Sequence, residues 1–186
     1  MITQDNIGAI RPQLVGISGK AGSGKSTAAQ VLIDAGWTRV KMAGPLKDML
    51  RAIGLTDAHI EGDLKEVPCD LLQGQTPRHA MIALGTEWGR DIIGANLWID
   101  LAARRIKGAL DAGCSVVVDD IRFDNEADVI RNLCGCTVRI DRASDIAIAH
   151  KSESGVVSDI EYENNGSVAE LRGFFDYVFL KSGEWE

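Results

Sequence analysis

The sequence has no long hydrophobic run and comparatively little positive charge, and both shortages exclude classes of protein. No apolar stretch approaches the about 20 residues that a membrane-spanning helix needs, so we expect no membrane insertion. The first residues hold no basic segment followed by an apolar one, which predicts no secretory signal and a cytoplasmic location. Lysine and arginine number 20 against 27 acidic residues, for a net charge of −7. Nucleic acids and anionic membranes need a basic face, so neither is an expected partner, whereas a small phosphorylated ligand remains compatible.

Cysteine and histidine are also scarce. Of the four cysteines, only Cys134-Gly-Cys136 is close-spaced, and that is not the usual spacing of zinc ligands. We therefore expect reduced thiols. None of the three histidines has a close nucleophile partner, so Ser-His-Asp chemistry has no support. No Asn-Lys pair occurs, which argues against a GTPase-like switch with the guanine-reading Asn-Lys-x-Asp run.

The length of 186 residues suits one domain, which we expect to span 1–186. Short apolar runs alternate with helical patterns. We expect strands at 14–18, 37–42, 115–119, 137–140 and 156–162. We expect helices at 25–34, 45–53, 77–84, a short one capped by Thr86, 97–111, 125–133 and 168–175, with 55–75 mostly loop. This alternation predicts an α/β fold of three layers, a mostly parallel five-stranded sheet with helices on both faces and the site at the carboxyl ends of the strands.

A glycine-rich segment follows the first expected strand. Gly19-Lys20-Ala21-Gly22-Ser23-Gly24-Lys25-Ser26 fits the pattern G-x-x-x-x-G-K-[ST] completely. Glycines let backbone N–H groups converge on phosphate oxygens, and the helix N-terminus adds the positive end of its dipole. We expect Lys25 to reach the β- and γ-phosphates and the Ser26 hydroxyl to coordinate Mg²⁺. The expected nucleotide-binding residues are Gly22, Ser23, Gly24, Lys25, Ser26 and Thr27.

An acidic pair follows the clearest expected strand. Asp119 and Asp120 come directly after Val116-Val117-Val118, and a carboxylate at this place can hold Mg²⁺ directly or through water. Side chains alternate in direction along a strand, so we expect one of the two aspartates to face the site. The sequence leaves open which one.

A set of cations indicates a second anion site, which separates a phosphotransferase from a hydrolase. Arg78 lies in the first turn of an expected helix, the wrong end for pairing with the helix dipole. On one straight helix Arg90 would lie ~18 Å away and be turned by about 120°, so we expect a break at Gly85-Thr86 to bring the two together. Lys47 and Arg122 are further candidates, and so are Arg139 in the next expected strand and Arg142 after it. Trp88 and Trp98 suit either base stacking or the core.

With these residues assembled, the chain resembles the bacteriophage deoxynucleoside monophosphate kinases, within the P-loop nucleoside monophosphate kinase group. The most particular motifs are Leu84-Gly85-Thr86-Glu87-Trp88-Gly89-Arg90 and Asp120-Ile121-Arg122-Phe123 with Asn125-Glu126. Further pieces are Ala43-Gly44-Pro45-Leu46-Lys47, His150 with Ser152-Glu153, and Asn165-Gly166-Ser167. The resemblance implies a P-loop NTPase fold, an acceptor-binding segment at about 44–95 and a short lid at about 142–156.

The resemblance also implies the reaction and its residues. The γ-phosphoryl group of ATP would pass to a deoxynucleoside monophosphate with Mg²⁺, giving the diphosphate. The catalytic residues would be Lys25, Arg78, Asp120 and Arg142, and the metal ligands Ser26 and Asp120. The acceptor-binding residues would be Lys47, Arg78, Thr86, Arg90, Trp98, Asp120, Arg122 and Glu126.

Two alternatives stay open at the level of sequence. A P-loop kinase of another acceptor, such as a sugar or the coenzyme A precursor, would need a base for the acceptor hydroxyl, for which Asp120 is a candidate. A phosphate acceptor has its second pKa near 6, so it is largely ionised at pH 7 and needs no strong base. A non-catalytic nucleotide-binding protein is the other alternative. The expected partners are small nucleotides, a homodimer is compatible with the sequence, and the base and sugar of the acceptor are not determined.

Overall fold

The computed structural model describes residues 12–142 and 156–181, and the chain divides into two compact units. The first unit comprises Met1–Lys41 and Arg105–Glu186, and the second comprises Met42–Arg104. The predicted acceptor-binding segment, 44–95, lies within the second unit. In the part of the chain that is described, no helix has both the length and the apolar character needed to cross a membrane.

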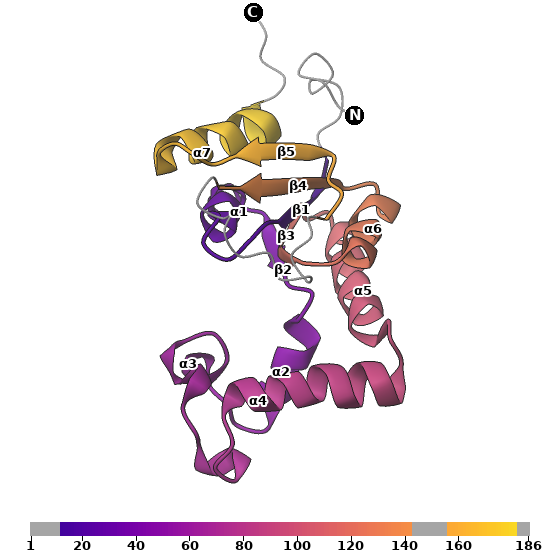
Figure 1. Cartoon of the computed structure of the whole chain (residues 1–186). Coiled ribbons are helices and arrows are strands. Elements are labelled where there is room, and N and C mark those ends of the chain that lie inside the picture. Colours follow the sequence, from indigo (N-terminus) through magenta and orange to yellow (C-terminus); the bar gives the residue numbers. More distant parts are fainter. Residues whose placement is uncertain (1–11, 143–155, 182–186) are drawn as a thin grey trace, which may run out of the picture. The chain divides into compact units, whose positions relative to one another are not determined.

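The first unit is built on a five-stranded parallel sheet in the order β2-β3-β1-β4-β5 (Figure 1). Its strands are β1 (Leu14–Ser18), β2 (Thr38–Val40), β3 (Val116–Ile121), β4 (Cys136–Asp141) and β5 (Ile160–Glu163). The central strand β1 is buried along its whole length, as expected for a parallel strand covered on both faces. The predicted parallel sheet is confirmed.

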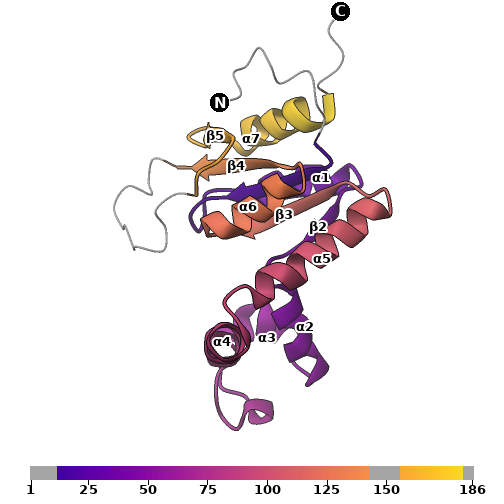
Figure 2. The same cartoon turned by 90° about the vertical axis from the view of Figure 1, so that its right-hand side faces the viewer.

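Helices cover both faces of this sheet. The helices of the unit are α1 (Lys25–Asp34), α6 (Asp124–Asn132), α7 (Val168–Phe175), the π-helix η6 (Asp176–Lys181) and the end of α5 (Leu97–Asp111). Val15 and Ile17 of β1 share a core with α1 and α7. Gly16 between them points to the other face, where a Cβ would meet Ile130 of α6 at 2.9 Å. Figure 2 shows α6 in front of the sheet and α1 behind it, so the three predicted layers are confirmed.

The second unit is helical. It contains α2 (Gly44–Ala52), α3 (Asp57–Ile60), η2 (Asp63–Glu66), η3 (Asp70–Leu72), α4 (Pro77–Ile82), η4 (Ala83–Ile93) and the start of α5. Its core gathers Leu46, Leu50, Leu55, Ile60 and Trp98. The prediction of mostly loop at 55–75 missed three short helical turns. The first of them begins at Thr56, whose hydroxyl lies 2.8 Å from Nδ1 of His59, a local pairing that stabilises a helix start.

The break predicted at Gly85-Thr86 is wrong. Ala83–Ile93 continues from α4 as a π-helix, and Thr86 caps no new helix. The indole Nε1 of Trp98 donates to the Gly85 carbonyl at 2.8 Å, so this carbonyl is satisfied from outside the helix. The wider turns, with i→i+5 hydrogen bonds, end where the Gly94 N–H donates to the Gly89 carbonyl. A widened helix therefore replaces the expected break, and spacing rules for a straight α-helix do not apply to Arg78 and Arg90.

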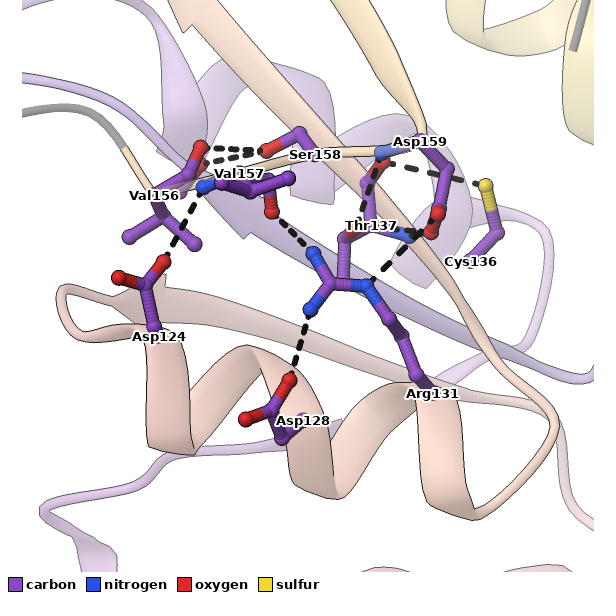
Figure 3. A network of polar contacts seen from close by, with 10 residues as sticks. Asp124, Asp128, Arg131, Cys136, Thr137, Val156, Val157, Ser158 and Asp159 are labelled. Carbon is purple, nitrogen blue, oxygen red and sulfur yellow. Dashed lines mark hydrogen bonds and ion pairs between the residues drawn. The ribbon is translucent and has the colours of Figure 1, made fainter. Parts of the chain in front are cut away.

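Strand β5 starts four residues later than predicted, because residues 156–159 form side-chain contacts with α6 and β4 (Figure 3). The Asp159 carboxylate accepts hydrogen bonds from the Thr137 N–H and hydroxyl, both at 2.8 Å. Asp124 accepts from the Val157 N–H at 3.2 Å, and Arg131 donates to the Val157 carbonyl. Arg131 also pairs with Asp128 at 2.9 Å. This network joins the chain before β5 to both ends of α6.

Replacing Asp159 tests whether this network stabilises the first unit. Asp159→Ala leaves the buried Thr137 N–H without its partner, so we expect the free energy of unfolding in urea to fall by about 1–3 kcal/mol. Asp128→Ala is the matched control. It removes only an exposed ion pair to Arg131 and should cost less than about 1 kcal/mol. Equal losses in the two variants would contradict the role given to Asp159.

Candidate nucleotide-binding site

The predicted phosphate-binding loop lies between β1 and α1. Gly19, Gly22 and Gly24 have φ of 139°, 81° and 108°, and such positive values favour glycine. Lys25 is the first residue of α1, and Ser26 follows it with an exposed side chain. The backbone N–H groups of a first helical turn have no partner within the helix. The loop and α1 therefore present backbone donors and a helix dipole together, which is an arrangement suited to phosphate.

The Lys25 ammonium lies against the same loop. Its Nζ donates to the Gly19 carbonyl at 2.6 Å and to the Lys20 carbonyl. These contacts hold the positive charge beside the backbone that would surround the phosphates. Thr27, also predicted to bind nucleotide, is half-buried in the first turn of α1.

Ser23 is buried within the loop and is held from a distant part of the chain. Its carbonyl accepts a hydrogen bond from Nδ2 of Asn164 at 2.8 Å. Its own hydroxyl is a buried polar atom with no hydrogen-bond partner among the described residues. No local sequence pattern marks Asn164, because its partner Ser23 lies 141 positions earlier in the chain.

The two aspartates lie at a β-bulge of β3. Val118 is paired with Gly16 of β1, yet Ile121 is paired with Ser18, so Asp119 and Asp120 together lie opposite Ile17. A bulge of this kind changes the direction of side chains and is frequent beside active sites. Regular alternation, on which the prediction of a single site-facing aspartate relied, is interrupted at this point.

Arg39 of β2 binds the Asp119 carboxylate, and no sequence pattern predicted this pair. The Arg39 Nε lies 3.0 Å from Asp119 Oδ1, and Nη2 contacts Oδ2. The Asp119 side chain is only 3% exposed, so its charge is compensated inside the fold. Asp120 is half-buried. The pairing of β2 with β3, which brings Arg39 close, joins residues 80 positions apart and leaves no local signal.

Glu126, predicted to bind the acceptor, caps helix α6. Its Oε2 accepts from the N–H of Arg122 at 2.8 Å and of Phe123 at 3.3 Å, and the residue is buried. The Arg122 side chain is exposed. Glu126 therefore fixes the backbone that carries Arg122, and the contact of either residue with an acceptor remains a prediction.

The predicted acceptor-binding cations of the second unit are paired with nearby carboxylates. Lys47 Nζ lies 2.7 Å from Glu61 Oε1. Arg78, in the first turn of α4 as predicted, lies 3.1 Å from Glu66, with side chains 54% and 65% exposed. The exposed Arg78–Glu66 pair contributes about 1 kcal/mol or less, so a doubly charged phosphate can displace this carboxylate, whereas the Lys47 side chain is only 13% exposed.

Other predicted acceptor residues lie on or beside η4. Thr86 is exposed and Arg90 is half-buried. Trp98 is buried in the core of the second unit, 6.0 Å from Trp88 between ring centroids. A Cβ on Gly89 would lie 2.3 Å from the Trp98 Nε1, so only glycine fits beside this indole. The structure thus gives Trp98 a packing role, and a contact with substrate remains a prediction.

The remaining predicted residues fall near the end of β4. Arg142 is exposed directly after that strand, whereas His150, Ser152, Glu153 and most of the predicted lid lie outside the described residues.

Burial raises the pKa of the Cys136 thiol to about 12, with the Asp159 carboxylate adding to the effect. A protonated thiol is a poor metal ligand. Within residues 12–142 and 156–181, no three or more histidine, cysteine or acidic side chains form a metal-binding group.

The Arg39–Asp119 pair can be tested by stability. Arg39→Ala leaves a buried carboxylate unpaired, so we expect the free energy of unfolding to fall by about 2–3 kcal/mol. The expected loss is smaller than for a fully buried pair, because Arg39 is one-third exposed and water screens the attraction. The double variant with Asp119→Ala should lose less than the sum of the single variants. Arg51→Ala, which breaks exposed pairs with Asp48 and Asp57, is the control and should cost about 1 kcal/mol or less. Additive losses would contradict the pairing.

Comparisons with known proteins indicate the family of this chain. A scan against models of protein families finds no match. The chain is 36% identical over 184 residues to the "Putative deoxynucleotide monophosphate kinase" of Acanthamoeba polyphaga mimivirus, covering 85% of this chain and 91% of that protein. Among solved structures, TT1252 from Thermus thermophilus superposes with a TM-score of 0.51 at 16% identity, over 92% and 98% of the two chains. This second likeness concerns the fold alone.

A further similar structure is Mycobacterium tuberculosis APS kinase CysC in complex with AMPPNP and APS. Its TM-score is 0.49 at 14% identity, over 90% of this chain and 97% of that one. The sequence relationship to the mimivirus protein spans most of both chains, and it includes both units described above. By this relationship, the chain belongs to the deoxynucleotide monophosphate kinase family.

Proposed function

We propose that this protein transfers the γ-phosphoryl group of ATP to a deoxynucleoside monophosphate. An oxygen of the acceptor α-phosphate forms a bond to the γ-phosphorus while the bond from that phosphorus to the β–γ bridging oxygen breaks. The products are ADP and the deoxynucleoside diphosphate. The observation that carries the proposal is the loop at residues 19–24, which opens into α1 in a chain of this family.

The donor side of the reaction belongs to the first unit. The loop supplies backbone N–H groups, and Lys25 supplies a point charge that moves from the Gly19 carbonyl to the β- and γ-phosphates. These donors are arranged before the nucleotide binds, so little reorganisation is needed when charge shifts during transfer.

The residues present fit a magnesium ion. Mg²⁺ prefers oxygen ligands and keeps several waters or phosphate oxygens, so it needs few protein side chains. The Ser26 hydroxyl is exposed at the start of α1, and Asp120 is a half-buried carboxylate at the bulge of β3. We therefore assign Ser26 and Asp120 as the residues that would hold the ion, which would neutralise charge on the transferring phosphoryl group when bound.

The acceptor side is assigned to cations of the second unit. Arg78 and Lys47 would bind the acceptor phosphate in exchange for Glu66 and Glu61, with Arg90 as a further candidate. No general base is needed, because the acceptor phosphate is already largely ionised at pH 7. Arg142, at the start of the predicted lid, is assigned to the phosphates of the donor.

Removing the loop lysine tests the donor assignment. Lys25→Ala should lower kcat by about 100-fold or more, because preorganised charge at the transferring group is lost. A coupled assay of ADP formation with ATP, Mg²⁺ and a deoxynucleoside monophosphate measures this. Lys107→Ala, an exposed lysine paired with Asp111 on α5, is the control and should leave kcat unchanged. Activity of Lys25→Ala equal to that of the control would contradict the loop assignment.

Removing Arg78 tests the acceptor assignment. Arg78→Ala should lower kcat/KM for the monophosphate more than about 100-fold, because two charge-assisted hydrogen bonds are lost. This change corresponds to about 3 kcal/mol of transition-state stabilisation. The dissociation constant for ATP should not change. Arg104→Ala, an exposed arginine of the same unit, is the control. A near-normal kcat/KM in Arg78→Ala would remove this residue from the site.

A further inference from the structure

Asn164 links the phosphate-binding loop to β5, the edge strand of the sheet. It follows β5 directly and is 6% exposed. Its backbone N–H donates to the Asp141 carbonyl at 2.8 Å, at the end of β4. Its side-chain Nδ2 donates to the Ser23 carbonyl, also at 2.8 Å. Asn164 is thus fixed by its backbone and, in turn, fixes one carbonyl of the loop.

The position of this carbonyl determines the direction of a neighbouring donor. A peptide unit is planar and trans, so its C=O and N–H point in opposite directions. With the Ser23 carbonyl directed to Asn164, the N–H of Gly24 is directed away from Asn164. Gly24 is the N-cap residue of α1, where unpaired N–H groups bind anions.

The close packing around this peptide leaves no room for a side chain at Gly24. A Cβ on Gly24 would lie 2.8 Å from Asn164 Nδ2 and 2.8 Å from Leu171 Cδ2 of α7. Gly24 also has φ of 108°, which side-chain-bearing residues rarely adopt. The turn between β5 and α7 therefore packs directly against the loop and leaves the Ser23–Gly24 peptide little freedom.

We propose that Asn164 is a positioning residue for polyphosphate binding, which holds the Ser23 carbonyl so that the Gly24 N–H faces the phosphate oxygens of the nucleotide. The proposal rests on the proposed nucleotide binding by this loop and is independent of the identity of the acceptor. Asn164 touches no phosphate itself and acts through the Ser23–Gly24 peptide.

Inorganic tripolyphosphate is the sharpest probe, because it has no base or sugar to contact other residues. Titration calorimetry with the full chain should show about tenfold weaker binding in Asn164→Ala and in Asn164→Leu. The Leu variant keeps the approximate size of the side chain and the backbone bond to Asp141, adds no charge, and cannot donate to Ser23. The KM for ATP should rise in parallel, while the KM for the monophosphate stays at the wild-type value.

Asn165→Ala is the matched control, since the adjacent side chain contacts Glu163 on the exposed side and should leave tripolyphosphate binding unchanged. A purely structural role would lower Tm without changing the dissociation constant well below Tm. If Asn164→Ala does not fold, Asn164→Leu decides. Tripolyphosphate affinity within about twofold of wild type in a folded variant, or no binding by the wild type, would overturn the proposal. Weaker binding in the variants of a protein that transfers no phosphoryl group would support it and refute the proposed reaction instead.

Discussion

Concentrated phosphate charge has to be met by backbone N–H groups whose directions are set before the ligand arrives. A flexible loop would lose much of the interaction energy in becoming ordered. Here the loop is fixed by the buried strand β1 before it, by α1 after it, and by Asn164 from the turn between β5 and α7. The sheet order, with β1 in the centre between β3 and β4, places these elements around one loop.

Burial separates the ion pairs that maintain the fold from those that a ligand can exchange. Asp119 is buried and held by Arg39, so its charge is committed to the fold. Asp120, the next residue at the same bulge of β3, is half-buried. In the second unit, Arg78 and Glu66 are both exposed, and water screens their attraction. The same residue types therefore form a buried pair at β3 and an exposed pair at α4.

Local signals predicted the first unit well, and long-range contacts explain what they missed. The bounds of α1 and α7 were predicted correctly because loop glycines precede α1, and Ser167 with Glu170 caps α7. The break at Gly85 was wrong because Trp98, 13 residues later, bonds the Gly85 carbonyl. Arg39 and Asn164 have no local mark, since their partners lie 80 and 141 positions away. Within the site, the loop could be predicted, but the residues that hold it and the bulge could not.

The most direct measurement traces where the γ-phosphoryl group of ATP goes. Purified protein is incubated with ATP labelled at the γ-phosphate, Mg²⁺ and each common monophosphate in its deoxy and ribo forms, and the products are separated by chromatography. The account predicts that the label appears at the β-position of at least one deoxynucleoside diphosphate, in amounts equal to the ADP formed. Release of the label only as inorganic phosphate with every monophosphate would contradict it.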